Sequence, residues 1–254
     1  MKKFSQALVW LTLAEIIYNF GGYIIQSSLG RILGPEAYGR YGLVVTLTTM
    51  IIILIGNGIP TAMSKYLSEI FESAPGKILG IKYQALRLQA ILMLSVTAIF
   101  FFAAPLIAWV LHDPSLTPLF QLSSLIIPAF AAASFYFYYF TGLHFFRVQA
   151  TLKIIRAISR VIFIIFLALF FGIEGAIAGY IVAPLFVFGM AVLFDIVITH
   201  RYFPSVRETK RKDVLLFSPK TILAYAGPLT AFLLFYELIL TLDLYFVKSM
   251  LKSD

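Results

Sequence analysis

The sequence contains no cysteine and few charged residues, and these two shortages exclude several classes of protein. Without cysteine there can be no disulfide, no thiol chemistry and no thiolate metal site. Charged residues make up 13% of the chain and hydrophobic residues 61%, whereas roughly a quarter of the residues in soluble domains are charged. This composition is typical of a protein that lies in a membrane.

Sequence motifs of the common enzyme classes are also missing. There is no Walker loop, dinucleotide-binding fingerprint, zinc-binding histidine pair or nucleophile elbow. Gly56 and Gly58 stand just before Pro60 inside an apolar run, so they do not form a phosphate-binding loop. The three histidines lie in separate connections, which argues against a shared metal site. We therefore expect no enzyme activity, no ATP-driven pumping by this polypeptide alone, no cofactor and no metal.

Long apolar stretches fill most of the chain. A hydrocarbon core about 30 Å thick is crossed by about 20 helical residues, and runs of this length satisfy their backbone groups in lipid as helices. The predicted fold class is all-α, a polytopic membrane protein with about seven transmembrane helices. The expected spans are residues 6–29, 41–62, 86–111, 117–141, 150–172, 175–198 and 222–247.

The distribution of basic residues predicts the orientation in the membrane. All lysines and arginines except Arg31, Arg40, Lys248 and Lys252 lie on the same side of the predicted spans as the N-terminus. The positive-inside rule therefore places the N-terminus in the cytoplasm and the protein in the cytoplasmic membrane. The net charge of +8 is then explained by topology and by contact with anionic lipid, and we expect no nucleic-acid partner.

Two connections on the cytoplasmic side are longer than the others. Residues 63–85 mix charged and apolar side chains, which predicts a short helix lying in the membrane interface. Residues 199–221 carry a basic run and are expected to link two structural units. Asp195, near the inner end of the sixth span, is expected to be hydrated.

Polar side chains inside the first two spans call for an explanation, because a charge at mid-bilayer costs at least about 2.5–3.5 kcal/mol. Glu15, Asn19 and Gln26 share one face of the first span with Gly22. The second span carries a milder polar face that includes Asn57. Two interpretations remain open: the faces line an aqueous cavity, or they form hydrogen bonds between helices with no role in transport.

The fifth and seventh spans carry further charges. Lys153, Arg156 and Arg160 follow one face of the fifth span. They either anchor the helix at the inner surface, with side chains that snorkel outward, or form a cationic stripe suited to phosphate or pyrophosphate. In the seventh span, Glu237 lies deep and is a candidate for an ion- or proton-linked role, while Asp243 lies near the outer end.

The connection between the first two spans carries the strongest local motif. It reads GRILGPEAYGRYG at residues 30–42 and forms a turn with a cationic rim made by Arg31 and Arg40. A second motif, GNGIPTAMSKYLSE, follows at residues 56–69. This pair at this spacing resembles the polysaccharide-transport branch of the multidrug/oligosaccharidyl-lipid/polysaccharide (MOP) exporter superfamily, whose members are Wzx-like flippases of lipid-linked oligosaccharides.

The resemblance implies two six-helix lobes around a central cavity that works by alternating access. Residues 1–198 would then be the N-terminal lobe, residues 199–221 the linker, and residues 222–254 the first helix of a second lobe that is otherwise missing. It also implies that Arg31 and Arg40 belong to the outer rim of the cavity, and that Asp243 corresponds to an acidic residue often found in the seventh helix.

The function expected on these grounds is translocation of lipid-linked oligosaccharide or polysaccharide precursors across the cytoplasmic membrane. The partners would be the lipid bilayer, a lipid-linked sugar, and a missing second half or a second copy of the chain. Two alternatives remain open. One is a cation-coupled multidrug exporter of the same superfamily, which would need buried acidic residues, and the other is a truncated product without transport activity.

Overall fold

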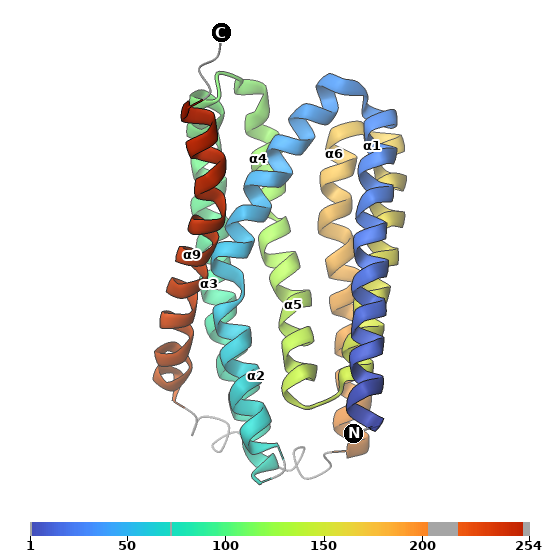
Figure 1. Cartoon of the computed structure of the whole chain (residues 1–254), viewed down its shortest axis with the longest axis vertical. Helices are drawn as coiled ribbons and strands as arrows, with labels where there is room; N and C mark the ends of the chain where they lie inside the picture. The colour runs from blue at the N-terminus through green and yellow to red at the C-terminus, as the bar shows by residue number, and fades with distance from the viewer. Residues whose placement is uncertain (1, 72, 203–217, 251–254) are drawn as a thin grey trace.

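Two helices of the computed structural model are long enough to cross a membrane twice, and each turns back at a glycine. The structure describes residues 2–71, 73–202 and 218–250. Helix α1 (Lys2–Gly56) turns at Gly34, where φ is 75°, and α6 (Phe146–Tyr202) turns at Gly172, where φ is 57°. Glycine adopts positive φ readily because it has no Cβ. Each helix is therefore a hairpin of two arms (Figure 1).

Single helices make up the rest of the described chain, in which there is no strand. The apolar segments Val9–Ile70, Pro75–Val110, Pro114–Gly142 and Phe146–Thr199 are long enough to cross a membrane, and with the two hairpins they account for the first six predicted spans. The all-α, multi-pass prediction is confirmed. The remaining elements are α2 (Gly58–Ile70), the 3-10 turns η1 (Pro75–Lys77) and η2 (Pro114–Leu116), α3 (Ile78–Val110), α4 (Thr117–Ser124), α5 (Ile126–Gly142) and α9 (Pro219–Met250).

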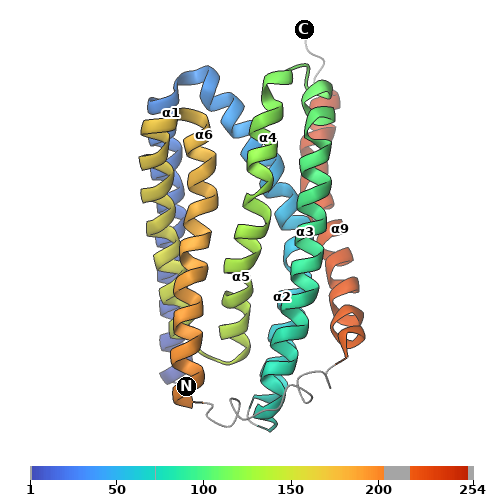
Figure 2. The ribbon, with the colours of Figure 1, turned by 180° about the vertical axis from the view of Figure 1, so that it is seen from behind.

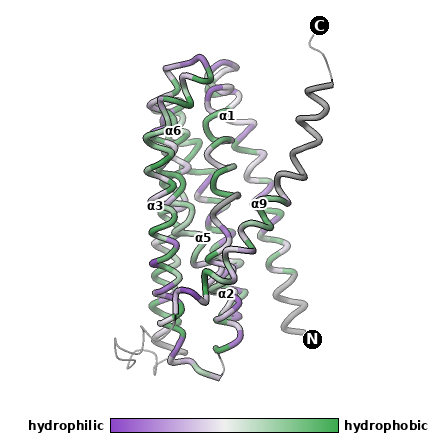
Figure 3. Tube along the Cα trace, turned by 90° about the vertical axis from the view of Figure 1, so that its left-hand side faces the viewer, coloured by the Kyte–Doolittle hydropathy of each residue, from purple (hydrophilic) through white to green (hydrophobic). Residues whose placement is uncertain are grey.

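The connections gather at two ends of the bundle. The end at the bottom of Figures 1 and 2, called the near end, holds the start of α1, the α2–α3 connection and the α5–α6 connection. The opposite end, at the top of both figures and called the far end, holds the turns at Gly34 and Gly172 and the α3–α4 connection. Hydrophobic residues follow most of each helix, and hydrophilic ones gather toward the ends (Figure 3). The chain therefore alternates between two sides, as a multi-pass membrane protein must.

The predicted interfacial helix over residues 63–85 is wrong. Helix α2 continues the second span to Ile70, and α3 begins at Ile78, so most of this segment belongs to the bundle. The fourth span also differs from its prediction, because it is interrupted at Leu125, between α4 and α5. Pro128 contributes to this interruption, since it has no N–H to donate to the carbonyl of Ser124.

The hydrated position expected for Asp195 is also wrong. Asp195 on α6 and Lys82 on α3 are each only 7% exposed, and the Lys82 ammonium donates a hydrogen bond to the Asp195 carboxylate. Lys82 Nζ also lies 5.2 Å and 4.6 Å from the ring centroids of Tyr136 and Tyr139 on α5. The Thr199 hydroxyl donates to the same carboxylate at 3.4 Å. This buried ion pair joins α3 to α6 through the core.

Buried apolar side chains form two separate cores along the bundle. The near core includes Met63, Leu67 and Phe140, from α2 and α5. The far core includes Ile25 and Phe120, from α1 and α4. Lipid tails are as apolar as these side chains, so close packing, rather than removal of apolar surface from water, holds the helices together.

The crossing of α2 and α5 gives a test of this packing. A Cβ atom at Gly142 would lie 2.7 Å from the carbonyl oxygen and 2.9 Å from the Cα of Ser64. Both are backbone atoms, so Gly142→Ala is expected to force the helices apart and destabilise the protein by about 1–3 kcal/mol. The measurement is the melting temperature of the purified protein in detergent.

Gly189→Ala is the matched control for that substitution. Nothing lies within 4 Å of a Cβ built at Gly189, which sits in the second arm of α6. Alanine is a better helix former than glycine, so the melting temperature of this variant should stay the same or rise. An equal melting temperature for Gly142→Ala and the parent would contradict the close crossing.

Candidate functional site

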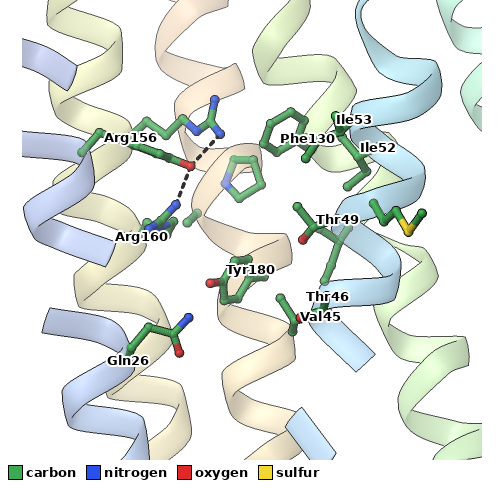
Figure 4. Close-up of a pocket in the computed structure, with 15 residues that line it drawn as sticks. Gln26, Val45, Thr46, Thr49, Ile52, Ile53, Phe130, Arg156, Arg160 and Tyr180 are labelled. Carbon is green, nitrogen blue, oxygen red and sulfur yellow. Dashed lines mark hydrogen bonds between the residues drawn. The ribbon is translucent and has the colours of Figure 1, made fainter. Parts of the chain in front are cut away.

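A cavity of about 480 Å³ opens between the arms of α1, the start of α5 and both arms of α6 (Figure 4). Its volume falls within the range of about 300–1,000 Å³ that is usual for small-molecule sites. Most of the wall is apolar. The polar side chains that line it are Tyr18, Gln26, Thr46, Thr49, Arg156, Arg160 and Tyr180.

Arg156 and Arg160 form the cationic part of the wall. They lie one turn apart on the first arm of α6 and so face the same side. Arg156 Nη2 donates to the Tyr18 hydroxyl at 3.1 Å, and Arg160 donates to the same hydroxyl through Nη1 (Figure 4). A guanidinium has five N–H donors, so this shared oxygen leaves most donors of both side chains available for a ligand.

Aromatic rings hold the two guanidiniums by their faces. Arg160 Cζ lies 4.3 Å from the ring centroid of Tyr18 and 5.9 Å from that of Tyr180. Arg156 Cζ lies 4.3 Å from the ring centroid of Phe130. Cation–π contact stabilises a cation without neutralising its charge. The arginine pair, Arg156 and Arg160, is therefore positioned and remains positive.

The charge of the cavity is not balanced by acidic groups. Among the described residues, no carboxylate lines the cavity, and neither member of the arginine pair has one within 4 Å. Lys153, the third cation of the predicted stripe, differs because its ammonium donates to Glu15 at 2.8 Å. The cavity therefore favours an anionic ligand.

The structure gathers some of the predicted site residues and separates others. Gln26 lines the cavity and accepts a hydrogen bond from the Tyr38 hydroxyl at 2.7 Å. Glu15 does not line the cavity and pairs with Lys153. Asn19 is exposed and does not line the cavity. Asn57 lies between α1 and α2, where its carbonyl accepts from the Thr61 hydroxyl at 2.7 Å.

The residues predicted for the outer rim lie at the far end of the bundle, outside the cavity wall. Arg31 is exposed. Arg40 pairs with Glu36 at 3.3 Å and with Asp113 at 3.6 Å, so it ties the Gly34 turn to the α3–α4 connection. A hydrogen bond from the Ser115 hydroxyl, and then the charge of Arg40, hold the pKa of the Asp113 carboxyl below its ordinary value. Glu237 and Asp243 are on α9, and their side chains lie outside the described part of the chain.

Sequence reasoning missed the aromatic residues of the site. Tyr18 had a signal, because it stands three residues after Glu15 and four before Gly22 and so shares the polar face of the first span. Tyr180 and Phe130 had none. Both lie in apolar stretches rich in aromatic residues, and only the fold brings them to the arginine pair.

Solved structures of membrane transporters share this fold. An outward-facing multidrug resistance MATE family transporter of the MOP superfamily matches 90% of the chain with a TM-score of 0.70 and 16% identity. A MOP superfamily transporter from Pyrococcus furiosus, described as having a binding pocket of reverse polarity, matches 90% with a TM-score of 0.65 and 14% identity. The Vibrio cholerae MATE transporter VcmN in its bent form matches 98% with a TM-score of 0.65 and 16% identity.

The chain covers 52%, 52% and 59% of these three structures, so it spans little more than half their length. No curated protein sequence matches it significantly. The model of the family described as "polysaccharide biosynthesis protein" matches residues 4–254, which is nearly the whole chain. The chain therefore belongs to the polysaccharide biosynthesis protein family, with the N-terminal half of the MOP transporter fold.

Proposed function

We propose that the chain is the head-group-binding half of a flippase that moves lipid-linked oligosaccharide precursors across the cytoplasmic membrane. The observation that carries the proposal is the arginine pair in a cavity that is lined by no carboxylate of the described residues. Lipid-linked sugars are joined to their carrier through phosphate or diphosphate. Guanidinium forks bind such groups through two parallel, charge-assisted hydrogen bonds.

The proposed path keeps the lipid tail in the bilayer while the head group passes through the cavity. The positive-inside rule puts the near end of the bundle in the cytoplasm. Arg156 and Arg160 then lie on the arm of α6 that rises from the cytoplasmic side, where a precursor made in the cytoplasm would first meet them. On the wall opposite the arginine pair, Thr46 and Thr49 of α1 offer hydroxyls to a bound sugar (Figure 4).

We propose further that residues 1–198 form one lobe and that residues 222–254, which include most of α9, begin a second, joined by the linker at 199–221. Most of that linker lies outside the described residues. Because the chain covers only 52% and 59% of the solved transporters, a second half or a second copy would complete the cavity. Without it, the chain would bind the head group and fail to move it.

A cation-coupled multidrug exporter is the second candidate, favoured by the likeness to MATE family transporters. Cationic drugs need acidic or neutral aromatic walls, whereas this cavity presents two guanidiniums. The Pyrococcus furiosus relative, whose pocket of reverse polarity suggests a different function, is a precedent for different charge in pockets of this fold.

A transport assay separates these candidates. Purified protein is reconstituted in liposomes with a fluorescent short-chain polyprenyl diphosphate sugar, and movement between leaflets is followed by quenching with dithionite. A parallel set of liposomes measures ethidium uptake driven by a sodium or proton gradient. We expect no ethidium uptake, and movement of the lipid sugar only where a second half or a second copy completes the cavity. Ethidium uptake alone would establish the exporter, and binding of the lipid sugar without movement would indicate an incomplete transporter.

A further inference from the structure

The second membrane crossing is interrupted for a chemical reason. Helix α1 ends at Gly56 and α2 begins at Gly58. Pro60 has no N–H and cannot donate to the carbonyl of Gly56, four residues earlier. A buried carbonyl needs another donor. Gln89 of α3 supplies it, because its Nε2 donates to the Gly56 carbonyl oxygen at 3.3 Å. A side chain from a neighbouring helix thus replaces a backbone hydrogen bond.

Among the described residues, only the nitrogen of the Gln89 side-chain amide has a hydrogen-bond partner. The residue is 3% exposed, and among the described residues its Oε1 has no hydrogen-bond partner. The Nε2 contact is longer than the usual range of about 2.7–3.2 Å for a hydrogen bond. Turning the amide over would set two acceptors against each other at Gly56, so the orientation is fixed. A leucine would fill this place without an orphaned acceptor, so packing alone does not account for the amide.

The interruption coincides with a boundary in the lobe. On one side, Thr49 and Ile52 of α1 line the cavity, and Ile52 belongs to the far core. On the other side, Ile59 belongs to the near core. Gly58 packs so closely on α9 that a Cβ atom there would lie 2.1 Å from Thr230 Oγ1. The cavity wall and the contact with α9 thus meet at the interruption.

We propose that residues 56–60 are a hinge in the second span and that Gln89 is the residue that positions it. The cavity-lining arm of α1 tilts at this hinge, while α2 stays packed on α5 and α9. The long hydrogen bond from Gln89 to the Gly56 carbonyl holds one position of the hinge and breaks when the arm tilts. Tilting at the hinge thereby moves the wall of the cavity relative to α2 and α9.

Distance measurements between two spin labels test the hinge directly, and they need no substrate. The chain has no cysteine, so Leu43→Cys and Ser68→Cys provide two unique labelling sites. Both positions are exposed, on opposite sides of the hinge, about 37 Å apart along the helix. In lipid nanodiscs we expect two separate distance populations for the labelled parent. Pro60→Ala restores the N–H, so it should leave one population. Identical distributions, or one population in both, would overturn the proposal.

A double-substitution cycle tests the role of Gln89. Gln89→Leu should lower the melting temperature in the parent and broaden the spin-label distances. In the Pro60→Ala background the backbone supplies the missing hydrogen bond, so the same substitution should lower the melting temperature by less than half as much. Pro105→Ala, inside α3, is the control and should leave the effect of Gln89→Leu unchanged. Equal losses in all three backgrounds would overturn the assignment of Gln89 to the hinge.

Discussion

Replacing Arg156 and Arg160 together by glutamine is expected to weaken the binding of a polyprenyl diphosphate sugar by about 100-fold or more. Each hydrogen bond to a charged group contributes about 1.5–3 kcal/mol, and about 1.4 kcal/mol corresponds to a tenfold change in affinity. Glutamine keeps much of the length and polarity of arginine and removes its charge. The measurement is the dissociation constant of the purified protein in nanodiscs, determined by microscale thermophoresis.

Two further variants show whether the loss belongs to the site. Arg87→Gln removes the same charge from an exposed position on α3 that does not line the cavity, and its affinity should match that of the parent. Tyr18→Phe removes only the hydroxyl to which both guanidiniums donate, and should give an intermediate loss. If Arg87→Gln weakened binding as much as the double variant, general surface charge rather than the arginine pair would attract the lipid.

Replacing Asp195 by alanine is expected to destabilise the protein by about 3–5 kcal/mol, since it leaves the ammonium of Lys82 buried and unpaired. Domains are commonly stable by only about 5–15 kcal/mol, so much of the variant should be lost on purification. Trp10 and Trp109 provide an intrinsic fluorescence signal for the melting temperature in detergent.

The double variant Lys82→Met with Asp195→Leu separates the cost of an unpaired charge from the need for the pair itself. Apolar replacement of a whole buried ion pair is often neutral or stabilising, so this variant should melt close to the parent. Glu15→Ala is the matched control, because it breaks the exposed pair with Lys153, and exposed pairs contribute about 0–1 kcal/mol. A normal melting temperature for Asp195→Ala would show that the pair is not buried as described.

The spans could be predicted from the sequence because lipid sets a strict requirement for apolar length. Interruptions within them were harder to place. Gly56, Gly58 and Pro60 are visible as helix breakers, yet nothing local indicates that Gln89 would satisfy the freed carbonyl. The continuation of α2 to Ile70 was missed because its charged residues resemble an interfacial segment. Lys65, for example, lies 4.5 Å from the ring centroid of Tyr225, a contact that only the packing of α9 creates.

The site could be predicted in part, for a similar reason. Helical spacing put Arg156 and Arg160 on one face, and the structure brings both to the cavity with Gln26. The pairing of Lys153 with Glu15 joins residues 138 positions apart, and that of Lys82 with Asp195 joins residues 113 positions apart. No local pattern shows which cation of a stripe finds a carboxylate. Lys153 is paired with a carboxylate, whereas Arg156 and Arg160 are not, and these two arginines therefore decide the charge of the cavity.

Competition followed by native mass spectrometry shows whether the cavity takes a lipid diphosphate head group. The protein is mixed with equal amounts of a polyprenyl diphosphate sugar, the same polyprenol without phosphate, and ethidium. We expect the diphosphate to be the bound species in the parent and to be lost when Arg156 and Arg160 are both replaced by glutamine. Preferential binding of ethidium, or equal binding of the two lipids, would contradict it.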